Sequence, residues 1–576
     1  MQSPSLSEQT DSTMIEEPLL NNNTAKGGFR TLPFIIVNEA FEKLASYCLT
    51  PNMILYLTKE YGMQNVAATN LILLWSAASN FTPILGAFLS DSYVGRYWMI
   101  GFGSIASLLG MSLLWLTTMI PRSRAPCHES AESCSSPTAI ELLVLYSSFA
   151  LMSLGAGGVR SSSLAFGADQ LRKRGKDGGI YESYLNWYYA ASAAAVLIGM
   201  TLMVYIQDKM GWKVGFGIPV VLMFISAASF FLASRFYIKI KGKTNLFSGI
   251  AQVPVAAYRN RQVPLSSQVT YDLYHHERES TCLMPSDNLR FLNKACIIKN
   301  PQQDLTPEGR ASDPWSLCSV DKVEEFKALI RIVPIWTTGI MLAVNLSQSS
   351  FLVLEASSMD RHISSGFEIP AGYFGTFMIV FIILWIALYE RVIVPLASKV
   401  RGRKTHLDVK QKMGVGLVSS CIAIASLAVV ESFRRKLAIE EGFSDDPKAV
   451  VNMSALWLLP RQIFDGLAEA ANRVGQNEFY LSELPQSMSS IASSLSGLGM
   501  SVANLVASLM LSIVDNVTER EGEVSWLSNN INKGHYDYYY WLICSLSLLN
   551  YMYFLYCSKA YGPCKGEKEK GSDEEG

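Results

Sequence analysis

Three charged residues interrupt the first long apolar segment of the chain. Glu39, Glu42 and Lys43 are followed by Tyr47, so the four side chains occupy helical positions i, i+3, i+4 and i+8 on one face. Burying a charge at the centre of a membrane helix costs about 2.5–3.5 kcal/mol, which favours residues that are paired and have a role. A desolvated carboxylate beside a cation can exchange a proton near physiological pH. The alternative is a solvated cap at the cytosolic end of the helix.

Further charges interrupt two later apolar segments. Arg160 stands alone in the small-residue stretch GAGGVRSSSLAFGADQ, whereas Asp465, Glu469 and Arg473 follow one another at i, i+4 and i+8. Because an unpaired arginine inside a helical bundle is costly, we expect an acidic partner on another helix, and Glu469 is the predicted one. The alternative is that Asp465 and Arg473 neutralise Glu469 within its own helix, while Arg160 extends its head group toward water.

Metal, cofactor and enzyme chemistry find no support in the sequence. The ten cysteines show no CxxC spacing, and the chain has no GxSxG, HExxH or Walker motif. The histidines lie in predicted loops or at helix edges: His128, His275, His276, His362, His406 and His535. The sequence therefore predicts no enzyme activity, no cofactor and no metal, and it leaves proton exchange to carboxylates.

The composition indicates a membrane protein. Hydrophobic residues make up 49% of the chain and charged residues 17%, against about 25% charged residues in a typical soluble domain. The net charge of −1 selects no nucleic-acid partner. Apolar stretches long enough to cross a bilayer as helices are predicted near 33–58, 68–92, 97–120, 139–166, 184–207, 214–237, 326–351, 370–394, 411–432, 453–481, 488–514 and 536–558.

Six stretches, a polar gap and six more stretches predict an all-α membrane protein with 12 transmembrane helices in two six-helix halves, the layout of the major facilitator superfamily. Lysine and arginine cluster after the fourth, sixth and eighth stretches, which places both termini in the cytosol; Arg434-Arg435-Lys436 is an exception to this bias. The predicted parts are a cytosolic tail at 1–30, a six-helix bundle at 31–237, a basic cytosolic linker with one amphipathic helix at 238–322, a second bundle at 323–558 and a cytosolic tail at 559–576.

Several motifs resemble one family. Glu39-x-x-Glu42-Lys43, GAFLSDSYVGR at 86–96, GGVRSSSLAFGADQ at 157–170 and NWYY at 186–189 are similar to signatures of the plant nitrate/peptide transporter family. This family is related to the proton-dependent oligopeptide transporters. The stretches FIIVNEAFEKLASY, SAASNFTP and SMSSIASSL most resemble its first subfamily.

The resemblance implies a major facilitator fold, proton symport and a central cavity. It assigns proton coupling to Glu39, Glu42 and Lys43, and it makes Arg160 and Glu469 a salt bridge between the two halves. Asn345 stands at the position where a nitrate-binding histidine can occur in the family. The residues assigned to substrate binding are Tyr47, Arg160, Asn345 and Glu469.

Three functions are compatible with these observations. The first is low-affinity, proton-coupled symport of a small anion such as nitrate, and the second is the same mechanism with a plant hormone (a gibberellin or jasmonate) or a small peptide. The third is a membrane sensor that binds ligand without transport. The full set of carboxylates and cations favours transport, because a sensor needs no proton pathway. The expected partners are a small solute, protons and the lipid bilayer, and the expected location is the plasma membrane.

Overall fold

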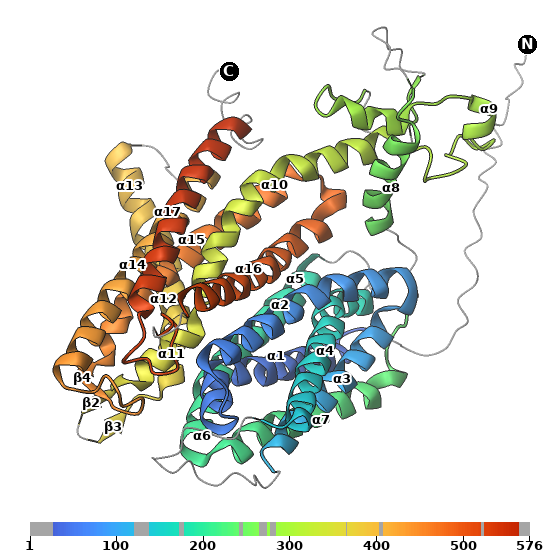
Figure 1. The fold of residues 1–576 in the computed structure, drawn as a ribbon. Coiled ribbons are helices and arrows are strands. Elements are labelled where there is room, and N and C mark those ends of the chain that lie inside the picture. Colours follow the sequence, from blue (N-terminus) through green and yellow to red (C-terminus); the bar gives the residue numbers. More distant parts are fainter. Residues whose placement is uncertain are drawn as a thin grey trace, which may run out of the picture.

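The computed structural model describes residues 27–119, 137–171, 178–240, 246–263, 273–276, 284–364, 366–402, 407–519 and 524–563. Two groups of long helices lie side by side, the first coloured blue to green and the second yellow to red (Figure 1). The predicted basic cluster after the fourth stretch, and most of the two predicted tails, lie outside the described residues.

Each of the first six predicted stretches corresponds to a long helix. These are α1 (Leu32–Leu55), α2 (Asn65–Leu89), α3 (Arg96–Thr117), α4 (Ala139–Leu171), α5 (Gly178–Ile198) and α7 (Trp212–Leu232). A π-helical segment, Gly199–Met203, continues α5 into α6 (Val204–Met210). Pro51 lies inside α1 and Pro83 inside α2, positions where a missing backbone hydrogen bond bends a helix.

The second group repeats this arrangement. Its helices are α10 (Val320–Leu346), α11 (Ser349–Ser357), α12 (Phe374–Leu388), α13 (Val394–Arg401), α14 (Val409–Glu440), α15 (Leu459–Glu483), α16 (Ser489–Thr518) and α17 (Tyr536–Tyr561). Four short strands lie at one end: β1 (Met359–Asp360) pairs in parallel with β4 (Val451–Ser454), and β2 (His362–Ser364) pairs antiparallel with β3 (Phe367–Glu368).

Ten helical segments in the described part of the chain are long and apolar enough to cross a membrane, and α1 and α15 are not among them. These two helices carry the charged positions singled out by the sequence except Arg160, which lies on α4. They occupy the interior of the bundle, where α1 packs against α5 and α7 and α15 packs against α12 and α14. The architecture is the predicted all-α membrane fold of the major facilitator type.

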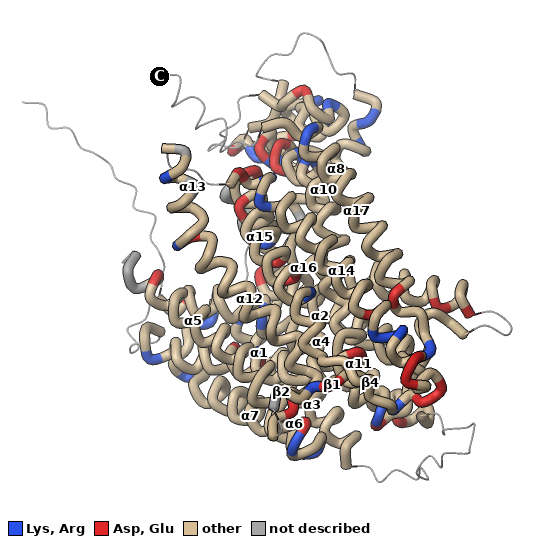
Figure 2. Tube along the Cα trace, turned by 90° about the vertical axis from the view of Figure 1, so that its left-hand side faces the viewer, with Lys and Arg blue, Asp and Glu red and all other residues tan. Residues whose placement is uncertain are grey.

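The described part of the predicted linker is folded. It contains α8 (Leu246–Arg259), the short helix α9 (Pro301–Asp304) and a 3-10 segment, Arg290–Cys296. Val253, Leu292 and Cys296 are buried in a small apolar core that also includes Val323 of α10. The linker is therefore packed onto the first turns of α10, where its charged residues gather at one end of the molecule (Figure 2).

Polar contacts close the two halves against each other at the end opposite to the linker. The amide of Asn65 at the start of α2 donates to Asn529 Oδ1 at 2.8 Å, and the Asn70 side chain donates to Ser512 of α16 at 3.0 Å. Tyr373, which follows the strands, donates to the carbonyl of Thr201 at 2.9 Å. At the other end the halves diverge, and the start of α1, the linker and the end of α17 all lie there (Figure 1).

Arg434 belongs to the basic cluster at 434–436 that does not fit the predicted distribution of lysine and arginine, and the structure explains its position. Arg434 lies inside the bundle with a side chain that is 0% exposed, and its guanidinium forms two hydrogen bonds to Glu431, at 2.6 and 2.8 Å. It also donates to Asn532 Oδ1 at 2.6 Å and to the carbonyl of Ile531 at 2.7 Å. Arg434 is thus a buried structural cation that joins α14 to the loop before α17, and not a free charge of a loop.

Replacing Arg434 by Leu should strongly destabilise the protein, since it leaves the Glu431 carboxylate without its cation. Removing one partner of a buried pair typically costs about 3–5 kcal/mol. Lys436→Leu is the matched control, because Lys436 is exposed two positions further along and its effect should stay within about 0.5 kcal/mol. Thermal unfolding in detergent measures both variants, and equal midpoints would contradict the structural role of Arg434.

Candidate functional site

A cavity lies between the two halves at the end where they diverge. One part, of about 540 Å³, is bounded by α2, α4, α5 and α16 and includes Arg160. A second part, of about 700 Å³, is bounded by α1, α2, α5, α15 and α16 and includes Tyr47 and Arg473. The two parts share the lining residues Asn80, Ser493 and Gly497, so they lie next to each other.

The charged cluster of α1 lies inside the N-terminal half. Lys43 Nζ lies 3.4 Å from Glu39 Oε1, which is the pairing that their spacing predicts. Glu42 is completely buried, and its two oxygens accept hydrogen bonds from Ser46 at 2.7 Å and from Arg160 at 3.0 Å. Glu39 and Glu42 thus each have one cation, and a solvated cap is excluded because both carboxylates are buried.

Close helix packing holds Arg160 against α1. A Cβ atom at Gly157 would lie 2.7 Å from Thr82 Cβ of α2, and one at Gly158 would lie 2.7 Å from Gly103 Cα of α3. Contacts that short are not tolerated, so glycine at these two positions lets α4 approach both neighbours. Arg160 follows two residues later and extends toward α1, where its guanidinium also lies 5.7 Å from the ring centre of Tyr47.

The predicted salt bridge between Arg160 and Glu469 is not formed in this conformation. Arg160 pairs with Glu42 of its own half, and Glu469 pairs with Arg473 one helical turn further along α15. Asp465 pairs with Arg461, one turn before it, at 3.1 Å. The reason is local: a partner at i+4 is held in reach by the helix itself, whereas a contact between the halves requires the cavity to close.

Asn345 requires a correction, because the structure does not place it at the cavity. It is buried in α10, and its amide donates to Ser420 of α14 at 2.7 Å and to Ser547 of α17 at 2.9 Å. Asn345 is not among the described residues that line either part of the cavity. Its polar side chain holds three helices of the C-terminal half together, which spacing along one helix does not reveal.

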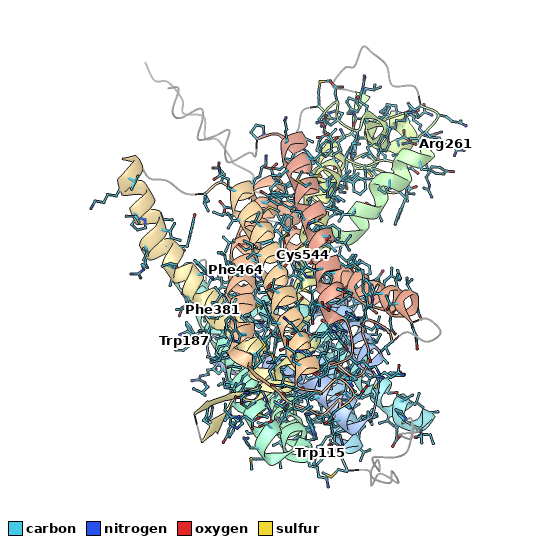
Figure 3. All side chains as sticks on the ribbon, turned by 60° about the vertical axis from the view of Figure 1, so that its left-hand side comes forward. Trp115, Trp187, Arg261, Phe381, Phe464 and Cys544 are labelled. Atoms are coloured by element: carbon cyan, nitrogen blue, oxygen red, sulfur yellow. The ribbon has the colours of Figure 1, made fainter. Side chains whose placement is uncertain are left out.

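Of the remaining assigned residues, Tyr47 and Arg160 line the cavity and Glu469 lies beside it. The NWYY motif of α5 is divided: Tyr189 lines the cavity, whereas Trp187 points outward at the surface of the bundle (Figure 3). Adjacent residues of a helix face directions about 100° apart, so a motif contiguous in sequence serves the cavity with only part of its residues.

The loop between α2 and α3 fixes one edge of the cavity. Gly95 has φ = 84°, a conformation favoured by glycine, and it turns the chain sharply into α3. Arg96 then pairs with Asp91 at 3.2 Å and with Asp169, near the end of α4, at 2.8 Å. These ion pairs tie the ends of three N-terminal helices together, so the helices can move as one body.

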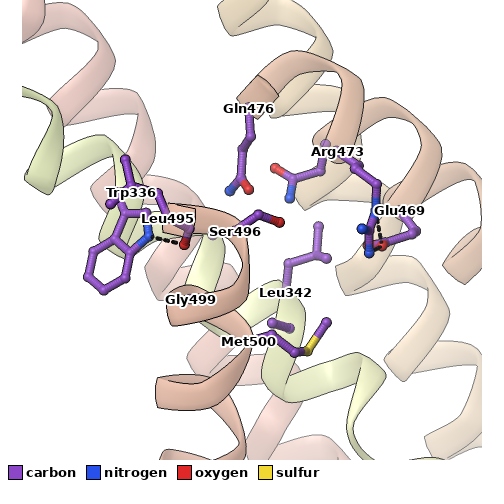
Figure 4. A pocket seen from close by; sticks show the side chains of 12 residues that line it. Trp336, Leu342, Glu469, Arg473, Gln476, Leu495, Ser496, Gly499 and Met500 are labelled. Atoms are coloured by element: carbon purple, nitrogen blue, oxygen red, sulfur yellow. Dashed lines mark hydrogen bonds and ion pairs between the residues drawn. The ribbon is translucent and has the colours of Figure 1, made fainter. Parts of the chain in front are cut away.

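Sequence reasoning did not identify Arg473 as a residue of the cavity. It lies on α15 beside Gln476 and Glu469, and its guanidinium donates to Glu469 Oε1 (Figure 4). Asn477 and Asn80 are further polar lining residues. Arg473 and Gln476 follow Glu469 on the same polar face of α15, so their spacing in the sequence could have identified them. Asn80 lies on α2, and no spacing in the sequence relates it to Glu469. Among the described residues, no group of His, Cys, Asp and Glu is arranged to hold a metal ion.

The fold and the site define a class of protein, a polytopic transporter of the major facilitator type with a central cavity. A family model of the POT family matches residues 97–527. Protein NRT1/PTR FAMILY 1.2 of Arabidopsis thaliana is 53% identical over 555 residues, which cover 95% of this chain and 91% of that protein. Protein NRT1/PTR FAMILY 1.1 of the same plant is 50% identical over 564 residues, covering 96% and 95%.

A crystal structure of an auto inhibited POT family peptide transporter shares the fold, with a TM-score of 0.66 and 18% identity over 92% of this chain and 97% of that one. The chain therefore belongs to the POT family of membrane transporters. Its identity with the two Arabidopsis proteins confirms the predicted membership of the first NRT1/PTR subfamily. It is a transporter-family protein and not an enzyme.

A double-mutant cycle should find Arg160 coupled to Glu42 more strongly than to Glu469. Side chains in direct contact show coupling energies of about 0.5–3 kcal/mol, whereas distant ones add within about 0.5 kcal/mol. Single and double alanine variants of Arg160 with each carboxylate are compared by thermal unfolding in detergent. A larger coupling of Arg160 to Glu469 would contradict the pairing seen here.

Proposed function

We propose that this chain is a proton-coupled symporter that moves an anionic solute across a membrane. The observation that carries the proposal is the ion pair of Arg160 with the fully buried Glu42 at the wall of the cavity. The arginine keeps its charge at every physiological pH and faces the cavity, so an entering anion meets a fixed cation. The carboxylate behind it is the group that takes up a proton.

The Glu42 carboxylate and the anion compete for Arg160, and this competition couples the binding of the proton to the binding of the anion. While Glu42 is ionised, its carboxylate holds the guanidinium and opposes the binding of an anion. A proton on Glu42 removes this opposition, so proton and anion bind together more tightly than either binds alone, and the effect is reciprocal. Glu39, one turn before Glu42, and Lys43, directly after it, belong to the same cluster, and we assign them with Glu42 to proton coupling.

We further propose that Arg160 and Glu469 pair when the cavity closes. In the present conformation each has a partner within its own half. Movement of the halves toward each other would bring the two residues together, so that Arg160 passes from one carboxylate to another and is never left unpaired. Such an exchange makes closure sensitive to protonation of Glu42 and to the bound anion, which is how a ligand shifts a two-state equilibrium.

Several substrates are compatible with this proposed function. Nitrate needs a single cation and is the expectation from the family resemblance; a plant hormone with a carboxylate, or a small peptide, is the alternative. A sensor without transport remains the competing class. The presence of both a buried carboxylate and a cavity-facing cation supports transport, since ligand binding alone requires only the cation.

Glu42→Gln should abolish acid-stimulated uptake while leaving the protein at the cell surface. Glutamine keeps the size of the side chain and one accepting oxygen, but it carries no charge and cannot exchange a proton. Uptake of nitrate, a dipeptide, a gibberellin and a jasmonate by oocytes is measured at pH 5.5 and 7.5, with surface expression measured in parallel. Unchanged acid stimulation in the variant would reject the assignment, and binding of a panel member without uptake would favour a sensor.

We propose a plasma-membrane location with both termini and the linker in the cytosol, so that the cavity opens to the cytosol here. A cysteine introduced at Glu308 in the linker should react with an impermeant maleimide only after permeabilisation, whereas one at Lys448, at the opposite end, should react in intact cells. Both positions are exposed, and the unmodified protein gives the background of native cysteines. Labelling of the Glu308 variant in intact cells would reverse the orientation.

A further inference from the structure

Two arginines face the same cavity from opposite halves of the molecule. Arg160 on α4 lines the part of about 540 Å³, and Arg473 on α15 lines the part of about 700 Å³. Tyr47 lies near both arginines. It lines the second part together with Arg473, and the centre of its ring lies 5.7 Å from the Arg160 guanidinium. The cavity therefore has a cation on each of its two main walls.

Each arginine is more exposed than the carboxylate that it pairs with. The side chain of Arg160 is 22% exposed and that of Glu42 is 0% exposed; the corresponding values for Arg473 and Glu469 are 55% and 9%. Both ion pairs thus present their cation toward the cavity and keep their acid behind it. Among the described residues that line the larger part, Arg473 is charged and the others are polar or apolar.

We propose that Arg473 forms a second anion subsite, and that the substrate is an organic anion with acceptor groups at both ends, such as a dicarboxylate. One end would be held by Arg160 and the other by Arg473, across the gap between the halves. This inference rests on the proposed function and names its substrate class. Guanidinium groups suit carboxylates because their parallel donors match the two oxygens.

Size and charge both support this class. Pockets of about 300–1,000 Å³ take organic ligands of drug size, and nitrate, with four heavy atoms, would fill little of such a space. A zwitterionic peptide needs an acidic group to receive its ammonium. Glu469 is covered by Arg473, and Asp91 and Asp169, which line the smaller part, are both paired with Arg96. A two-ended anion uses both walls and brings the halves together as it binds.

The test compares ligands that differ by one acceptor group. Binding of adipate, hexanoate, nitrate and dialanine to detergent-solubilised full-length protein is measured at pH 7.5 by ligand-induced thermal shift and calorimetry, without a proton gradient. Adipate and hexanoate have the same chain length, so they isolate the second carboxylate. We expect adipate to bind at least about tenfold more tightly than hexanoate, the size of effect typical of one charge-assisted hydrogen-bonding group.

Four variants assign the difference to Arg473. Arg473→Gln should reduce adipate affinity to that of hexanoate, and Arg473→Lys should retain most of the preference. Arg473→Gln also uncovers Glu469, which would repel anions, so the variant with both Arg473→Gln and Glu469→Gln removes that repulsion and should still lack the preference. Arg290→Gln is the control, because Arg290 is equally exposed at 54% and paired with an acid, but lies in the linker.

The outcomes separate the two levels of the proposal. If the wild-type protein binds none of the anions, the anion-transport function itself fails. If anions bind but adipate and hexanoate bind equally, or if the preference survives in the double variant, the second subsite is rejected and the proposed function stands. Tighter binding of dialanine than of adipate by the wild-type protein would also overturn the inference, since it would show an acidic site on the C-terminal wall.

Discussion

A charge removed from water must be paired, and this constraint organises the whole interior of the molecule. Five buried carboxylates of the described bundle pair with a lysine or an arginine, in the pairs Glu39–Lys43, Glu42–Arg160, Glu431–Arg434, Arg461–Asp465 and Glu469–Arg473. Four of them join residues three or four positions apart on one helix, so the helix supplies the partner. Glu42–Arg160 alone among these five joins two helices.

Ion pairs within α1 and within α15 explain how these two charged helices can lie inside the bundle. Helices α1 and α15 do not meet the apolar composition of a lipid-facing span, but neighbouring helices shield their charges from lipid. A charged helix in this position also brings its polar face to the central space. The charged residues that make α1 and α15 poor membrane helices therefore include Glu42, which pairs with Arg160 of α4, and Arg473, which lines the cavity.

The two ends of the molecule are stabilised by different means. At the closed end, neutral side chains such as Asn65 and Asn70 form hydrogen bonds between the halves, and such bonds contribute only about 0.5–1.5 kcal/mol each. At the open end the ion pairs of Arg96 hold each neighbouring helix end within the N-terminal half. Neutral hydrogen bonds between the halves and ion pairs within one half suit a molecule whose halves move as rigid bodies.

The sequence by itself determined the helices, their order and the charged positions, because apolar length and i, i+4 spacing are local properties. It also marked Glu39–Lys43 and offered Glu469–Arg473 as an alternative. Tertiary structure alone decided that Glu42 receives Arg160, that Asn345 ties α10 to α14 and α17, and that Arg473 faces the cavity. These outcomes depend on how helices distant in sequence rotate and approach, as glycine allows for α4, and no spacing along a single helix encodes that.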